Sequence, residues 1–598
     1  LATRVRSYDM LAVADAYARL VPQLLSVECW GGATFDVAMR FLHECPWRRL
    51  TALRERMPNI LTQMLLRASN GVGYKNYADN VVIHFVEQAA DAGVDIFRIF
   101  DSLNWVENMR IAIDAVAATG KIAEAAICYT GNLSDPRCTK YDLKYYVKMG
   151  KQLEAAGAHV LGIKDMAGLC RPQAARDLVR ALKQEVAIPI HFHTHDTSGI
   201  AAASVLAAVE AGVDAVDAAV DAMSGLTSQP NLGSIVEALR HGPRETGLDA
   251  DAIRKLSHYW DEVRGNYLAF ESEERAGASE VYVHGMPGGQ YTNLREQARS
   301  LGLGEHWPEV AQAYAEVNDM FGDIVKVTPS SKVVGDMALM MVTSGLTRAA
   351  VEDPAVDVAF PESVVSFFRG DLGQPPGGFP QALQNKILAG EAPITVRPGS
   401  VIPPVDLAAA RAEAEHKVDR HISEHELASY LMYPEVFVDY AHTRRMYGDL
   451  TDLPTSVFFY GMELGEEISV ALDHGPTLVI RYLGTNEHHD DGMRTVYFEL
   501  NGQPRTVKVE DKTQTASKPP RAKAEAGNAR HVGAPMPGLI AQINVRAGEE
   551  VAKGDALMTI EAMKMQTSIR AERDGRIAEV AVQPGAQVES KDLLVIFE

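Results

Sequence analysis

One lysine near the C-terminal end of the sequence lies between two methionines. Met563, Lys564 and Met565 separate two strand-like runs, and Asp574-Gly575 and Pro584-Gly585 mark turns between further short strands. Two large apolar side chains at an exposed turn are uncommon without a reason. The pattern favours a small all-β module that holds Lys564 at a hairpin tip, where its amine can be modified and can serve as a swinging arm. The alternative is an ordinary surface lysine.

Three histidines, His191, His193 and His195, occupy alternate positions of one predicted strand. Because successive side chains of a strand point to opposite faces, all three lie on the same face. Neutral imidazoles placed in this way are ligands for a divalent metal. The alternative is a set of buried histidines whose nitrogens are satisfied by hydrogen bonds.

A further candidate ligand, Lys164, stands at the end of the preceding predicted strand. A lysine ammonium has no lone pair and cannot bind a metal. A lysine that has reacted with CO₂ is an anionic carbamate, which can. The alternative is a charged Lys164 that pairs with a carboxylate, and the residues alone leave both interpretations open.

The first 275 residues alternate short β runs with amphipathic helical stretches. The predicted strands are 25–30, 61–67, 96–101, 124–130, 159–165, 188–195 and 215–220. Apolar residues at helical spacing over 79–92, followed by Gly93, are typical of a helix and its C-terminus. Regular βα alternation predicts a parallel sheet. Polar residues follow many different strands, which favours a (β/α)8 TIM barrel that lacks its first strand over an open doubly wound sheet.

Four further parts follow the barrel, which spans residues 1–275. We expect a helical extension over 276–446, a β-rich assembly region over 447–511, a linker over 512–530 and an all-β, lipoyl-like carrier module over 531–598. Asn501-Gly502 predicts a hairpin turn in the assembly region. The linker is charged and rich in Ala, Pro and Lys, so the carrier module should be tethered by a flexible segment.

Composition narrows the possible partners. The chain has 58 basic and 79 acidic residues and a net charge of −21, so its surface should repel nucleic acid and anionic membranes. No apolar run is long enough to cross a bilayer. Five scattered cysteines suit a reduced compartment, and we expect the cytoplasm. The sequence starts at Leu1 rather than Met, which indicates the interior of a longer protein.

Several stretches, in order and at matching spacing, resemble the pyruvate carboxylase family. They are 28–36 (ECWGGATFD), 63–67 (QMLLR), 71–74 (GVGY), 160–169, 193–199 (HTHDTSG), 326–332 (KVTPSSK) and 499–503 (ELNGQ). The C-terminal Ala-Met-Lys-Met is similar to the signature of biotinyl domains, which usually have Glu where this chain has Gln566. The resemblance covers nearly the whole chain, as a carboxyltransferase region followed by a biotin carrier.

The resemblance implies two cofactors. Lys564 would carry covalent biotin, attached by a biotin protein ligase. Lys164, as a carbamate, would bind a divalent metal, Zn or Mn, together with His193 and His195. The family has a fourth ligand, an aspartate, in a first barrel strand with an Arg-Asp-x-His-Gln pattern that would precede Leu1. We therefore expect weak catalysis from the chain as written.

The resemblance also implies roles at the substrate. Arg67 would bind the pyruvate carboxylate with its guanidinium fork, although it could equally pin a loop carboxylate. The enolate of pyruvate needs cationic stabilisation, which a metal and Arg67 supply. Thr328 would relay a proton, or else serve as a capping or turn residue before a proline. Asp36 and Tyr74 would line the pocket, or else form an ordinary buried pair.

By this resemblance the chain transfers CO₂ from carboxybiotin to pyruvate and forms oxaloacetate, a reaction of anaplerosis and gluconeogenesis. Two other functions compete: the α subunit of a biotin-dependent oxaloacetate decarboxylase sodium pump, and a truncated, non-catalytic scaffold that bears biotin. The stretches 193–199 and 499–503 favour the carboxylase over the pump.

Expected partners follow from the same resemblance. No ATP-binding motif of a biotin carboxylase half is found, so ATP and bicarbonate should act at another domain or subunit. We expect a homotetramer, with no nucleic-acid and no membrane partner.

Overall fold

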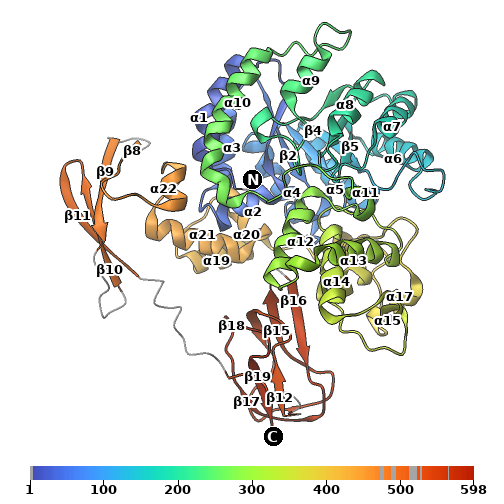
Figure 1. Cartoon of the computed structure of the whole chain (residues 1–598), viewed down its shortest axis with the longest axis vertical. Coiled ribbons are helices and arrows are strands. Elements are labelled where there is room, and N and C mark those ends of the chain that lie inside the picture. The colour runs from blue at the N-terminus through green and yellow to red at the C-terminus, as the bar shows by residue number, and fades with distance from the viewer. Residues whose placement is uncertain are drawn as a thin grey trace.

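The computed structural model describes residues 4–471, 477–485, 493–510, 522–525, 528, 530–562 and 565–598. Along the chain, an α/β part is followed by a helical part, a small antiparallel sheet and a C-terminal β module (Figure 1). None of the helices in the described ranges is both long enough and apolar enough to span a bilayer.

A parallel sheet forms the centre of the α/β part. Its strands pair in chain order: β1 (Ser26–Gly31), β2 (Leu61–Leu66), β3 (Ile96–Ile99), β4 (Ile122–Cys128), β5 (Val160–Asp165), β6 (Ile190–Thr194) and β7 (Ala215–Val216). All seven strand predictions are confirmed. Strands β1 and β7 are the two edges of this sheet, as expected for a barrel without its first strand.

The sheet is curled rather than flat. In a flat sheet, β1 and β7 would lie six strand spacings apart, about 29 Å. Arg98 on β3 nevertheless contacts Glu28 on β1 at 3.0 Å and Asp217, directly after β7, at 2.5 Å. Both edges therefore converge on the same interior, which is the geometry of a barrel.

Helices cover the outside of the sheet. They are α1 (Ser7–Leu20), α2 (Gly32–Arg40), α3 (Pro46–Arg56), α4 (Asp79–Asp91), α5 (Val106–Ala118), α6 (Leu143–Ala155), α7 (Pro172–Glu185), α8 (Ala201–Glu210), α9 (Leu232–Leu239) and α10 (Ala250–Arg264). Helix α4 buries Val81, Val82 and Phe85 at the predicted helical spacing. The chain leaves α4 through Gly93, whose φ of 116° lies in the region that favours glycine.

The helical part has a core of its own. It contains α11 (Val281–His284), α12 (Gly288–Ser300), α13 (Trp307–Met320), α14 (Ser330–Ser344), α15 (Arg348–Glu352), α16 (Glu362–Arg369) and α17 (Gln381–Leu388). Phe321, Phe367 and Phe368 are fully buried there. The amide of Gly288 donates to the carbonyl of Met166, just after β5, at 3.0 Å. This part therefore lies over the carboxyl ends of the barrel strands.

The following helices return to the barrel. They are α18 (Pro398–Val401), α19 (Leu407–Val418), α20 (Glu424–Met432), α21 (Pro434–Tyr447) and α22 (Thr455–Tyr460). Helix α20 contacts α4 and α21 contacts α2, so Leu427 and Phe437 belong to the barrel core. Helical structure thus extends beyond residue 446, into the region where we expected mainly strands.

A four-stranded antiparallel sheet follows, with β8 (Glu467–Ala471), β9 (Thr477–Thr485), β10 (Met493–Leu500) and β11 (Gln503–Glu510) in the order β11-β10-β9-β8. Asn501 and Gly502 have φ values of 48° and 78° at the β10–β11 connection, which is the predicted hairpin turn. The sheet leaves Leu483, Tyr497 and Val507 exposed.

The C-terminal module is a sandwich of two four-stranded sheets. Its strands are β12 (His531–Gly533), β13 (Gly538–Ile543), β14 (Glu550–Val551), β15 (Ala556–Ala562), β16 (Met565–Arg570), β17 (Gly575–Val580), β18 (Gln587–Val588) and β19 (Leu593–Phe597). The module lies against the helical part (Figure 1), where β16 contacts α16 and Met536 packs on the helical core.

Candidate functional site

The side chains of His193 and His195 face each other at the carboxyl end of β6. Their Nε2 atoms are 3.1 Å apart. Nδ1 of His195 lies 2.6 Å from the carbonyl of Thr227, and Nδ1 of His193 lies 2.6 Å from a carboxylate oxygen of Asp217. Both of these partners can only accept, and Asp217 lies closer to Nδ1 of His193 than the donor Nη1 of Arg98 does, at 3.1 Å. This geometry favours a hydrogen on each Nδ1 and a lone pair on each Nε2.

Two lone pairs that face each other repel unless a cation lies between them. Two imidazole nitrogens on one tetrahedral Zn²⁺, each about 2.05 Å from it, are about 3.3 Å apart. The separation of His193 and His195 is close to this value, so the pair fits a divalent metal. Among the described residues, no cluster of three or more His, Cys, Asp or Glu side chains could hold a metal ion.

Lys164 lies beside the two histidines. Parallel pairing of β5 with β6 places Lys164 next to His193, and the lysine side chain is only 1% exposed. Its Nζ contacts the sulfur of Met166 at 2.7 Å and lies 4.8 Å from the ring centre of Phe100. No carboxylate of the described chain is within ion-pair distance of Lys164. The ion pair that we considered as an alternative is therefore not formed among the described residues.

Burial controls protonation in this group. It lowers the pKa of Lys164 to about 8 and that of His195 to about 4. Burial also lowers the pKa of His193 well below its usual value. At neutral pH, both imidazoles are therefore neutral, and a fraction of Lys164 is a free amine.

A buried network of charges lies beneath this group. His191 places Nδ1 2.9 Å from Glu124 and Nε2 2.8 Å from Asp217. Arg98 contacts the same two carboxylates. Burial alone would lower the pKa of His191, but the charges of Asp217 and Glu124 outweigh it and raise this pKa to about 10. His191 is thus a buried cation. Both of its nitrogens are satisfied by hydrogen bonds, which is the alternative that we considered for the histidines of this strand.

Sequence reasoning missed Arg98, Glu124 and Asp217. The available signal was a charged residue inside an otherwise apolar strand: Arg98 in IFRI and Glu124 in IAEAAIC. Buried charges are rare unless they are paired, so such residues indicate a network. Asp217 gives a weaker signal, because it follows a strand of two residues.

The loop after β5 is held by one carboxylate. Asp165 accepts hydrogen bonds from the amides of Leu169 and Cys170, at 2.9 and 2.8 Å, and from the hydroxyl of Thr194 at 2.8 Å. The last of these bonds ties the loop to β6. The relative positions of Lys164 and the histidine pair are fixed in this way.

A second group of predicted site residues gathers beyond β1 and β2. Arg67 is buried, and its Nη1 donates to the carbonyls of Val72 and Gly73. The ring of Tyr74 lies 5.0 Å from its guanidinium carbon. In the described residues, Nε and Nη2 of Arg67 have no hydrogen-bond partner. The side chain is therefore held by its loop, yet keeps donors for a carboxylate.

Asp36 and Tyr74 do not form the pair that we considered as an alternative. Asp36 accepts from Arg40 at 2.9 Å, and no hydrogen bond joins it to Tyr74 within the described chain. Tyr433, which sequence reasoning missed, donates to the carbonyl of Val72 at 2.7 Å and stacks on Phe35. The helices that return to the barrel thus complete this side of the site.

Thr328 precedes α14 and is joined to Pro329 by a cis peptide bond. It does not cap α14, whose N-cap is Pro329. In the described residues, the hydroxyl of Thr328 makes no hydrogen bond to either group of site residues. Ser330 donates to the carbonyl of Ser102 at 3.2 Å, which ties this segment to the loop after β3.

The predicted carrier residue, Lys564, lies outside the described residues, as does Met563. The strands on either side, β15 and β16, pair antiparallel up to Ala562 opposite Met565. The hairpin predicted around the lysine is therefore present up to the residues that flank it.

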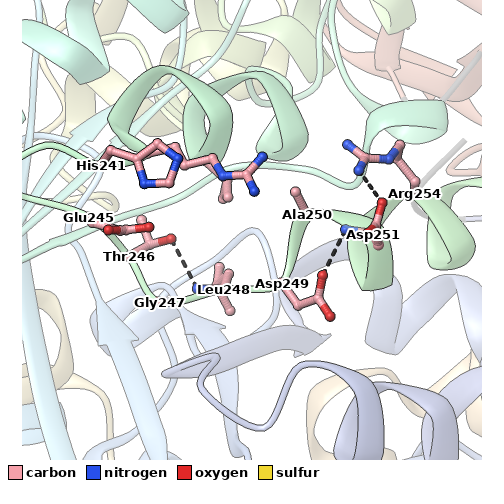
Figure 2. Close-up of a pocket in the computed structure, with 11 residues that line it drawn as sticks. His241, Glu245, Thr246, Gly247, Leu248, Asp249, Ala250, Asp251 and Arg254 are labelled. Atoms are coloured by element: carbon pink, nitrogen blue, oxygen red, sulfur yellow. Dashed lines mark hydrogen bonds and ion pairs between the residues drawn. The ribbon is translucent and has the colours of Figure 1, made fainter.

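A separate cavity of about 240 Å³ lies between the end of α9 and the start of α10 (Figure 2). It contains none of the predicted site residues. Its charged groups pair with one another, because Arg254 contacts Asp251 and Glu237. Asp249 accepts from the amide of Asp251 at 2.8 Å and caps α10. We assign no function to this cavity.

Three family models match the chain. A conserved carboxylase domain family (PYC_OADA) matches residues 281–481, an HMGL-like family matches residues 78–259, and a biotin-requiring enzyme family matches residues 530–597. The last match covers the C-terminal sandwich and includes Lys564.

Curated relatives match over the whole chain. Pyruvate carboxylase of Bacillus subtilis is 53% identical over 598 residues, which are 100% of this chain and 52% of the relative. Mitochondrial pyruvate carboxylase of Homo sapiens is 46% identical over 604 residues, which are 100% of this chain and 51% of the relative. The chain thus spans about half the length of these curated relatives.

Solved structures with a similar fold also come from pyruvate carboxylase. The carboxyl transferase domain from Rhizobium etli pyruvate carboxylase, with pyruvate and biocytin, is 61% identical, with a TM-score of 0.85 and 86% of each chain covered. The complete multifunctional pyruvate carboxylase from Rhizobium etli gives the same identity and TM-score over 86% of this chain and 50% of that one. The chain belongs to the pyruvate carboxylase family and corresponds to its carboxyltransferase barrel and biotin-carrier region.

Proposed function

We propose that this chain transfers a carboxyl group between biotin on Lys564 and pyruvate, with oxaloacetate as the carboxylated partner. The observation that carries the proposal is that the Nε2 atoms of His193 and His195 face each other, 3.1 Å apart, beside the buried Lys164. The solved relative that holds pyruvate and biocytin supports the choice of substrates.

The chain supplies two imidazole ligands and one potential carbamate to a divalent metal, Zn or Mn. Lys164 reacts with CO₂ as the free amine, and its pKa of about 8 makes that form available near neutral pH. The metal, when bound, provides positive charge next to the oxygen that becomes negative in the pyruvate enolate.

Arg67 binds and orients the carboxylate of pyruvate. Its Nη1 is fixed by two loop carbonyls, while Nε and Nη2 remain for the ligand. A preorganised donor of this kind costs little entropy when the substrate binds. Asp36 and Tyr74 line the same side of the pocket and exclude water from it.

Thr328 relays the proton. Its hydroxyl has no partner in the described residues and can accept the methyl proton of pyruvate while it donates to a basic nitrogen of the biotin ring. Biotin supplies the carboxyl group and the nitrogen that takes up this proton. Such proton transfer by a positioned side chain contributes about 10²–10⁴-fold to the rate.

The rest of the cycle requires partners. A biotin protein ligase attaches biotin to Lys564, and a biotin carboxylase domain or subunit uses ATP and bicarbonate to load it. Exposed apolar side chains on the β8–β11 sheet, Leu483, Tyr497 and Val507, support assembly into a homotetramer through this sheet. All five cysteines are free thiols, which suits the cytoplasm.

The reverse half-reaction tests the proposal. Oxaloacetate is added with free biotin and Zn²⁺ or Mn²⁺, and release of pyruvate is followed. We expect decarboxylation that depends on both biotin and metal and that is lost in Arg67→Lys, which cannot form the same two hydrogen bonds. A correctly folded, metal-loaded chain that gives no biotin-dependent pyruvate would contradict the proposal and favour the scaffold.

A further inference from the structure

Asp217 follows β7, and both of its carboxylate oxygens contact nitrogen atoms beneath the pair formed by His193 and His195. Oδ2 lies 2.6 Å from Nδ1 of His193 and 2.5 Å from Nη1 of Arg98. Oδ1 lies 2.8 Å from Nε2 of His191. Each of the three neighbouring nitrogens can present a hydrogen to this carboxylate. None of the roles proposed above requires a carboxylate at this position.

Two groups compete for Nδ1 of His193. The carboxylate of Asp217 is 2.6 Å away and can only accept a hydrogen bond, whereas Nη1 of Arg98 is 3.1 Å away and can only donate one. A neutral imidazole has a single nitrogen-bound hydrogen. If Arg98 were the partner, this hydrogen would lie on Nε2, the nitrogen that faces His195, and would block metal binding. The shorter contact to Asp217 favours the opposite tautomer.

We propose that Asp217 is a positioning residue, which selects the tautomer of His193 and holds its ring so that Nε2 stays bare and faces His195. This inference rests on the metal-dependent function proposed above and deepens it. Carboxylates that hold metal-binding histidines in this way typically contribute about 10–100-fold to metal affinity.

His191 then has a distinct role in the same strand. Its Nδ1 lies 2.9 Å from Glu124 and its Nε2 lies 2.8 Å from Asp217, so both nitrogens face carboxylates and both carry hydrogens. His191 and Arg98 together offset the negative charge of Asp217. The carboxylate can therefore orient His193 without drawing a second proton onto that ring.

Asp217→Asn tests this role directly. An asparagine side chain has one acceptor oxygen and one amide group, so it cannot accept from both His191 and the His193–Arg98 side. We expect the affinity for Zn²⁺, measured by competition with a chromophoric chelator, to fall by about 10–100-fold. The visible absorption of bound Co²⁺ should also change, because the ring of His193 is no longer fixed.

Glu124→Gln is the matched control. It removes a buried charge that contacts Arg98 and His191 in the same network, but Glu124 does not contact His193. We expect a lower melting temperature with Zn²⁺ affinity and the Co²⁺ spectrum unchanged. Asp217→Glu keeps both acceptor oxygens and should recover part of the affinity lost in Asp217→Asn, which separates positioning from general loss of stability.

The outcomes are distinguishable. Unchanged Zn²⁺ affinity in Asp217→Asn, an equal loss of affinity in Glu124→Gln, or no recovery in Asp217→Glu would each overturn the role of Asp217 and leave the proposed function intact. A wild-type chain that binds neither Zn²⁺ nor Co²⁺ would overturn both.

Discussion

The barrel mouth and the carrier module each contain one lysine to which we assign a chemical role, Lys164 and Lys564. Lys164 is 1% exposed, on a central strand of a parallel sheet, and loop 165–170 is tied down around it. Lys564 belongs to the connection between two antiparallel strands, in a module whose described contacts with the rest of the chain run through β16 and Met536.

Under the proposed function, one residue type serves two chemistries. In the barrel, loss of hydration lowers the pKa of the Lys164 amine, and the proposed carbamate forms from the free amine. For the proposed carrier lysine, access matters more than pKa, because an enzyme must reach the amine and the product must travel. Variants of the two regions should therefore fail in different ways.

Lys564→Arg should have the largest effect on the carrier. Arginine keeps the charge but cannot form the amide with biotin, so we expect complete loss of streptavidin binding after expression with a biotin protein ligase. The matched control is Lys553→Arg, at an exposed lysine of the same module, which should still be biotinylated. Streptavidin binding by Lys564→Arg would show that the carrier lysine is elsewhere.

Among barrel variants that keep the bound metal, Thr328→Ala should have the largest effect on catalysis. Without the hydroxyl, the biotin-dependent release of pyruvate from oxaloacetate should fall by about 10²–10⁴-fold, with unchanged metal content. Thr343→Ala, on the helix α14 that follows Thr328, serves as a control, because its hydroxyl already donates to the carbonyl of Leu339. A retained rate in Thr328→Ala would exclude the relay.

Carbamate formation on Lys164 should depend on pH in a defined direction. Because only the free amine reacts, the carbamate fraction at constant dissolved CO₂ should increase as the pH rises through about 8. The ¹³C signal of a carbamate, followed with ¹³CO₂ between pH 7 and 9, measures this change, and Lys164→Arg should show no such signal. A signal that is flat over this range would contradict the proposed role of the amine.

Met536→Ala should have the smallest effect, confined to the contact between the carrier module and the helical part. The side chain is half-buried against the helical core, so its truncation should cost about 1–2 kcal/mol of docking free energy, less than a fully buried methionine. Hydrogen exchange of residues 362–369 should become several-fold faster. Leu539→Ala, at a 40% exposed position of the carrier, should leave this exchange unchanged.

The sequence predicted the fold well where local patterns decide the structure. The seven strands, helix α4 with Gly93 and the Asn501-Gly502 turn follow from short-range periodicity and turn chemistry. The alternation of His193 and His195 also placed them correctly on one face of β6. In each case the interacting residues lie close together in the chain.

The network around Asp217 was not predictable in the same way. Arg98 is 95 residues from His193 and 119 residues from Asp217, so their contacts depend on how the sheet curls. The return of α20 and α21 to the barrel is likewise a long-range result, and it brings Tyr433 to the site. A resemblance supplied the roles of Arg67 and Thr328, which residue patterns alone left open.

The spacing of the three histidines on β6 has a consequence for how this strand can change. Substitution of one histidine removes one contact or one proposed role: the hydrogen bond from His191 to Asp217, or one of the two proposed metal ligands, His193 and His195. Inserting or deleting a single residue within Ile190–Thr194 would instead rotate all later side chains to the opposite face. A change before Phe192 would turn Phe192 and Thr194 toward the proposed metal site, so a change in the length of this strand should be more damaging than a single substitution.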